Sequence, residues 1–182
     1  MRVTNLRWIL PLSLSLAAMA VGGCGSSGGA SSTAAAPAPI PNQSSADERA
    51  IRAIVDNETD TWNKGDAVGY SRDFARDGVF TSIRGLAFDG YDAFLRQHDV
   101  IFKGIFRGTR LDQEIVVLRF PEPGLAIVET LTRVRGISEP PPGVSFDRNG
   151  HLRTRLLQVL VKRAGEWKII AYHNVDVKPN PN

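Results

Sequence analysis

Hydrophobic positions after residue 45 first follow a helical period. Ser45 and Glu48 in "SADE" fit a capping box, with Ser45 as the N-cap of a helix. Beyond it, apolar side chains recur at spacings near 3.6 on one helical face: Ile51, Ile54, Val55 and Trp62. Gly65 is a suitable C-cap. The pattern therefore predicts that an amphipathic helix opens the folded part of the chain.

Two shorter helices and a strand are predicted next. Asp66 can cap a second helix over residues 67–75 that buries Val68, Tyr70 and Phe74. The residues "RDG" at 76–78 then turn the chain into a strand, "VFTSI". A third helix over 91–102 carries apolar residues at helical spacing: Phe94, Leu95, Val100 and Ile101.

The period changes to two after Gly108. Long segments rich in branched residues occupy 111–120, 125–135 and 152–163, and a shorter one occupies 167–175. Turn-forming residues separate most of them, and a proline-rich stretch, 138–150, is long enough to be a mobile loop or flap. Helices followed by a meander of strands predict an α+β domain with one core.

The N-terminal part has a different composition. Arg2 and Arg7 precede an uncharged, largely apolar run over 8–21, which is shorter than the roughly 20 residues of a bilayer-spanning helix and typical of a secretory signal. The following "VGGC" resembles the bacterial lipobox, which implies cleavage before Cys24 and lipid attachment to its thiol. An ordinary secreted protein is the alternative.

These features divide the chain into four parts. We expect a lipoprotein signal peptide at 1–23, a lipidated flexible linker at 24–45, a folded domain at 46–178 and a tail at 179–182. The linker holds no charged residue and almost no bulky apolar one, so it cannot bury enough surface to order itself. The protein is expected on the extracytoplasmic side of a membrane, held by the lipid on Cys24.

Charge and motifs exclude several classes of partner. The formal net charge of +3 falls to about +1 once Arg2 and Arg7 are removed, and no run of basic residues is present. We therefore expect no nucleic-acid partner. The sequence has no glycine-rich nucleotide motif and no histidine or acidic cluster at metal-ligand spacing, so we expect neither a cofactor nor a metal.

Three stretches together resemble a known superfamily. They are "ETDTWNKGDAVGYSRDFARDGVF", then "GYDAF", and at the end "GEWKIIAYHN". Their order is similar to that of the nuclear transport factor 2-like superfamily, most closely its SnoaL-like group and the SgcJ/EcaC subfamily. The resemblance implies a cone: a curved, mostly antiparallel sheet around N-terminal helices, with a pocket at the open end and commonly a homodimer. The superfamily contains ketosteroid isomerase, scytalone dehydratase and polyketide cyclases, and also members without catalysis.

The last strand supplies the main catalytic candidate. Strand alternation places Trp167, Ile169, Ala171 and His173 on one face, and the apolar members predict that this face is core. His173 should then point inward near the open end, where it could move a proton near neutral pH. The alternative is a histidine that only makes one buried hydrogen bond.

Glu129 is the second catalytic candidate. It shares one face of its strand with Arg133, and inside an apolar cavity desolvation would make it a candidate base. If that face is convex, the two residues are solvated or at a dimer interface, and the sequence leaves both placements open. With Arg133, the candidate pocket residues are Trp62, Tyr70, Phe74 and His98. A half-exposed surface position is the alternative for His98.

Three functions follow from these observations. The first is a lipid-anchored domain whose pocket binds a small, largely apolar molecule. The second is an isomerase, cyclase or dehydratase that transfers a proton on a polycyclic or carbonyl substrate. The third is a dimerisation or partner-binding module without catalysis.

Overall fold

The computed structural model of the protein describes residues 43–178. Two helices come first in this part of the chain, followed by two strands, a third helix and four further strands. The helices are α1 (Gln43–Trp62), α2 (Ala67–Ser71) and α3 (Tyr91–Lys103). The strands are β1 (Phe74–Thr81), β2 (Ala87–Asp89), β3 (Arg110–Glu122), β4 (Leu125–Arg135), β5 (Leu152–Arg163) and β6 (Glu166–Asp176). The α+β class is confirmed.

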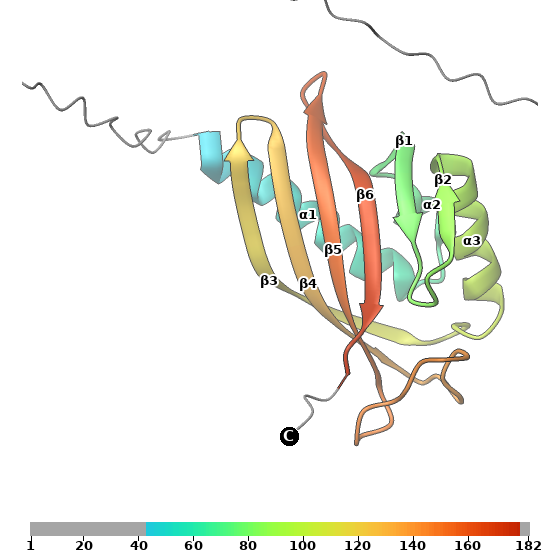
Figure 1. The fold of residues 1–182 in the computed structure, drawn as a ribbon. Helices are drawn as coiled ribbons and strands as arrows, with labels where there is room; N and C mark the ends of the chain where they lie inside the picture. The colour runs from blue at the N-terminus through green and yellow to red at the C-terminus, as the bar shows by residue number, and fades with distance from the viewer. Residues whose placement is uncertain (1–42, 179–182) are drawn as a thin grey trace, which may run out of the picture. The chain divides into compact units, whose positions relative to one another are not determined.

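The six strands form one mixed sheet in the order β2-β1-β6-β5-β4-β3. Every neighbouring pair is antiparallel except β1 and β6, which run parallel. Figure 1 shows the long strands curving, with α1 across one face of the sheet and α3 beside β1 and β2. The curved sheet wrapped around the N-terminal helices is the expected cone.

The core lies between α1 and the concave face of the sheet. Ile51 and Phe94 from the helices are fully buried against Val128, Leu156 and Leu160 from β4 and β5. A second apolar cluster lies at the starts of β3 and β5, where Val144 of the 136–151 segment packs with Phe106, Leu111 and Leu152. Each large side chain buried in this way contributes about 1.5–3 kcal/mol.

Several predicted boundaries move. Helix α1 begins at Gln43, so Ser45 lies within it, and Glu48 pairs with Arg52 one turn later. Helix α2 ends at Ser71 and not at residue 75, since the last two residues of the predicted range belong to β1, which begins at Phe74. Three predictions are therefore wrong: the Ser45 capping box, the burial of Val68, which is 65% exposed, and the turn at 76–78, which lies within β1.

Other local predictions are confirmed. The Asp66 carboxylate accepts from the Gly69 backbone N–H at 2.9 Å and caps α2. Gly65 takes the left-handed conformation just after α1. The ranges of α3 and of the four long strands agree with the sequence to within two residues. Within residues 43–178, no helix is long and apolar enough to cross a membrane.

Candidate functional site

A cavity of about 170 Å³ opens between the helices and the curved ends of the strands. Trp62 at the end of α1, Tyr70 of α2 and His98 of α3 form one side of its lining. Most of the remaining lining is apolar, from Phe80, Ile83, Leu86, Ile101, Ile105, Phe106, Leu111, Val134, Pro141, Pro142 and Leu152. The cavity is suited to a small molecule with a largely apolar body.

Two tyrosine hydroxyls meet at the wall of this cavity. The oxygens of Tyr70 and Tyr172 lie 2.5 Å apart, and both side chains are buried. Burial raises the pKa of both phenols well above their ordinary value, so both stay protonated at neutral pH. One of the two hydroxyl protons forms the hydrogen bond between the two oxygens. The other is available to an acceptor such as a ligand carbonyl.

His98 lies beside this tyrosine pair. Its ring centroid is 4.6 Å from that of Tyr70, and its Nδ1 is 2.8 Å from the carbonyl oxygen of Phe94. Because a carbonyl can only accept, Nδ1 carries the proton and the lone pair is on Nε2. Burial lowers the pKa of His98 to about 4, although the bond to Phe94 opposes this shift. The imidazole is therefore neutral at physiological pH and is a proton acceptor.

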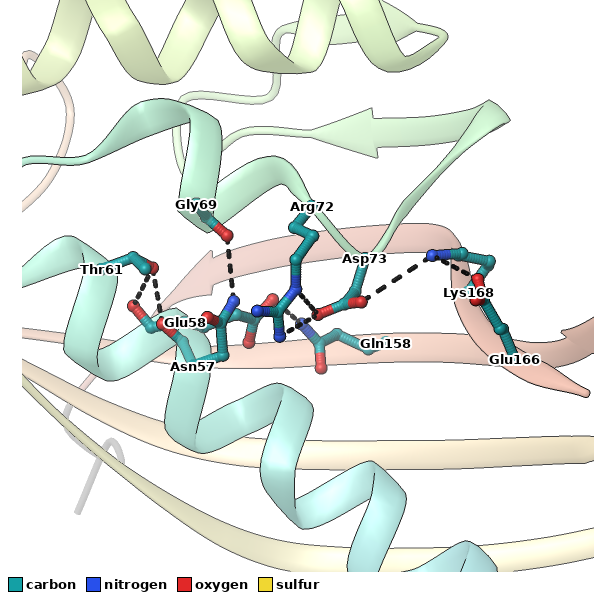
Figure 2. Close-up of polar contacts among 9 residues, drawn as sticks. All are labelled: Asn57, Glu58, Thr61, Gly69, Arg72, Asp73, Gln158, Glu166 and Lys168. Carbon is teal, nitrogen blue, oxygen red and sulfur yellow. Dashed lines mark hydrogen bonds and ion pairs between the residues drawn. The ribbon is translucent and has the colours of Figure 1, made fainter.

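A buried acid lies behind the same wall. Glu58 of α1 accepts from Gln158 Nε2 at 2.6 Å and from Gln113 Nε2 at 3.3 Å. Figure 2 shows Glu58 beside Gln158, with Asp73 farther along the same row of polar groups. Burial raises the pKa of Glu58 to about 8, and the Asp73 charge makes a small contribution in the same direction. The hydrogen bonds from the two amides lower this pKa, but by less than burial raises it. The carboxyl is therefore largely protonated at neutral pH.

Gln113 connects this acid to the cavity. Its amide nitrogen donates to Glu58 and, at 3.2 Å, to Thr130 Oγ1, while the side chain itself lines the cavity. A change at Glu58 would consequently reorient a group that a ligand touches. Glu58 and Gln113 are positioning residues in this arrangement.

His173 lies away from the cavity, and the prediction that it points inward is wrong. The cause is a bulge in β6: Val159 of β5 pairs with Ala171, but Leu160 pairs with Ile169, which leaves Ile170 as an extra residue. One extra residue reverses the alternation beyond it. Tyr172 therefore points inward and is buried, whereas His173 is exposed.

Glu129 and Arg133 lie on the outer face of the sheet. In β4 the buried positions are Ala126, Val128, Thr130, Thr132 and Val134, so the alternate set faces outward. Glu129 pairs there with Arg155 of β5 at 3.0 Å, and Arg133 is exposed. Of the two placements that the sequence left open, the convex one is correct.

Of the other pocket candidates, three line the cavity and one does not. Trp62 lines the cavity, and its indole N–H donates to Thr109 Oγ1 at 3.1 Å. Tyr70 and His98 line it too, so His98 is buried rather than half-exposed. Phe74 does not line this cavity, because its ring stacks on Phe94 in the core at 4.0 Å between centroids.

Sequence reasoning missed Glu58 and Gln113, and strand alternation placed Tyr172 on the face of the last strand opposite to the core. Glu58 had a signal, because it lies four residues before Trp62 and four after Ile54, on the apolar stripe of α1. A charged residue on such a stripe is buried when the helix packs. Tyr172 had none, since the bulge that turns it inward depends on pairing with β5.

The metal and lipid predictions concern different parts of the chain. Among residues 43–178, no group of three or more histidine, cysteine or acidic side chains is placed to hold a metal ion. Cys24 lies outside the described residues, as do the predicted signal peptide, the predicted linker up to residue 42 and the tail 179–182.

Comparison with known proteins places the fold. A domain of unknown function with a cystatin-like fold from Nostoc punctiforme is 26% identical, with a TM-score of 0.65 over 75% of this chain and 80% of that one. An NTF2-like protein of unknown function from Shewanella oneidensis is 16% identical, with a TM-score of 0.58 over 71% of this chain and 99% of that one. The fold is NTF2-like.

A third solved structure with this NTF2-like fold is described by an activity. The ketosteroid isomerase-like protein from Erwinia carotovora is 19% identical, with a TM-score of 0.57 over 76% of this chain and 99% of that one. No family model matches the sequence, and no curated protein matches it. At these identities the likeness establishes the NTF2-like fold, and function must be argued from the site.

Proposed function

We propose that the NTF2-like domain binds a small, largely apolar molecule in the cavity of about 170 Å³. One observation carries the proposal: an apolar lining surrounds a hydroxyl pair, Tyr70–Tyr172, that has a proton to donate. The apolar walls would bind the body of the ligand, and the hydroxyl pair would orient an oxygen on it. The finer resemblance to the SnoaL-like and SgcJ/EcaC groups agrees with this proposal.

Filling the cavity tests the proposal. Ile101 lines it, whereas its neighbour Val100 on α3 is 64% exposed. Native mass spectrometry of the full chain, purified from its own host, should detect a bound small molecule. Ile101→Trp should abolish the bound mass, and Val100→Trp, the matched control, should keep it. Equal retention by both variants, or no bound molecule with wild type, contradicts the proposal.

Proton transfer is the second candidate function. His98 offers a neutral Nε2 beside the tyrosine pair, and the pair can stabilise an oxyanion. An isomerase, cyclase or dehydratase acting on a carbonyl substrate needs these two roles. His98 would be the base and Tyr70–Tyr172 the donor, in place of His173 and Glu129. A base whose pKa is about 4 suits a substrate whose C–H proton is already acidic.

Isotope exchange distinguishes catalysis from binding. If the cavity transfers protons, the ligand recovered from the host should exchange a C–H for deuterium in D₂O when wild-type protein is present. His98→Asn should stop the exchange, and His173→Asn should leave it unchanged. A bound ligand that never exchanges leaves binding as the function.

We also propose that the protein is a lipoprotein of the cell envelope, anchored through Cys24. The support is the apolar run, the "VGGC" segment and the uncharged linker that follows it. Two or more acyl chains on one cysteine hold a protein firmly to a bilayer. Cys24→Ser should release the protein from membranes or block signal cleavage. A correctly cleaved variant that still partitions wholly with membranes contradicts the anchor.

Self-association is a further proposal, from the resemblance. The outer face of the sheet, which carries the exposed Leu157 and Val175, is the surface on which a second copy would pack. Analytical ultracentrifugation tests this: a homodimer should become monomeric in Leu157→Glu, and a wild-type monomer contradicts it.

A further inference from the structure

The mouth of the cavity carries one cation. Among the residues that line the cavity, Arg84 is the only one whose side chain is charged at neutral pH. His98 is neutral, and Tyr70 and Tyr172 keep their protons. No acidic side chain lines the cavity, so nothing in it repels an anion.

The backbone around Arg84 is held in place. It lies in the tight turn between β1 and β2, where the Ser82 N–H donates to the Leu86 carbonyl at 2.9 Å and the Gly85 N–H donates to the Ser82 carbonyl at 2.8 Å. The buried Ser82 hydroxyl also accepts from the Leu86 N–H at 3.2 Å. The turn thus fixes the point from which the arginine side chain extends.

The Arg84 guanidinium also has free donors. Within residues 43–178 it makes no ion pair and no hydrogen bond with another side chain. Among the described residues, five exposed arginines pair with a carboxylate and eight others, Arg96 among them, do not, so Arg84 is distinguished by its place on the cavity lining. An unpaired arginine at the rim of an apolar cavity matches a carboxylate, because its planar fork can bind both oxygens at once.

We infer that the ligand is an amphipathic monoanion: an apolar body inside the cavity and a carboxylate at the mouth, bound by Arg84. One cation fits one negative charge, and a polyphosphate would leave charge unmatched. This inference rests on the proposed binding function and specifies the ligand class. Arg84 determines specificity and takes no part in proton transfer.

Matched ligand pairs test the inference. Isothermal titration of the full chain would compare 2-naphthoate with 2-naphthylmethanol, and cinnamate with cinnamyl alcohol. In each pair the acid should bind about fivefold more tightly, which is the effect of a partly exposed ion pair near 1 kcal/mol. The preference should shrink as KCl is raised, because salt screens exposed charges.

Variants distinguish recognition of the carboxylate from binding in the cavity. Arg84→Gln should weaken acid binding about fivefold and leave alcohol binding unchanged. Arg96→Gln, an exposed arginine of α3 that does not line the cavity, should change neither. If the alcohols bind as tightly as the acids, or if both variants affect the acids alike, the inference is wrong while cavity binding stands. If no member of either pair binds, the inference is wrong, and the mass-spectrometric test shows separately whether the cavity binds another molecule.

Discussion

Replacing Glu58 by glutamine should change how the stability of the protein depends on pH. Glu58 is 1% exposed, and its pKa rises from 4.5 to about 8 on folding. Between these two values the folded state keeps the proton and the unfolded state has lost it. The free energy of unfolding therefore falls as pH rises through this range, by about 1.4 kcal/mol per pH unit.

The size of the effect follows from those two pKa values. Between pH 5 and pH 7, wild-type protein should lose about 2.5 kcal/mol of stability through Glu58. Glu58→Gln has no proton to lose, so its stability relative to wild type should increase by that amount over the same range. The new amide can be accommodated, because Gln158 Oε1 has no hydrogen-bond partner among the described residues and can accept from it after a flip.

Urea denaturation of the full chain at pH 5, 6 and 7 measures this difference. Glu114→Gln is the control, since Glu114 lies exposed on β3 and makes no ion pair within residues 43–178. Its stability relative to wild type should hardly vary with pH. A Glu58→Gln difference that is equally independent of pH would show that the two amide donors outweigh burial and keep the carboxylate ionised.

Three further perturbations test the rest of the site. The pKa of His98 is about 4 in the folded state against 6.5 in the unfolded state, so its contribution to stability is complete above pH 6.5 and is lost as pH falls towards 4. In the same urea assay, His98→Asn should remove about 2 kcal/mol of the stability that wild-type protein loses between pH 7 and pH 5. An unchanged dependence of stability on pH would contradict the buried neutral ring. Tyr70→Phe and Tyr172→Phe should each cost about 1 kcal/mol, with the double variant costing clearly less than their sum; additive costs would mean that the two hydroxyls do not interact. Asp66→Ala removes the cap of α2 and should cost about 1 kcal/mol, measured as a shift in the denaturation midpoint, whereas the exposed Asp60→Ala should cost little.

The sequence by itself determined the α+β class and most elements of the domain. Its strands 125–135 and 152–163 have the predicted bounds because alternation over ten or more residues leaves little ambiguity about the period. Turn and cap residues such as Gly65 and Asp66 act within a few positions along the chain, so their roles are also local. The pocket candidates Trp62, Tyr70 and His98 could also be named from local sequence, because they lie on or beside apolar helical stripes.

Only the tertiary structure decided which strand residues face the cavity. The bulge at Ile170 arises from pairing with β5. Because of it, Tyr172 lies at the cavity wall in place of His173. The faces of β4 depended on where α1 packs, which placed Glu129 and Arg133 outside. The protonation of Glu58 and His98 depends on how completely distant segments exclude water from them. Alternation is a local property, whereas register and burial depend on which distant segments meet, and for this reason the site could not be derived from spacing along the chain.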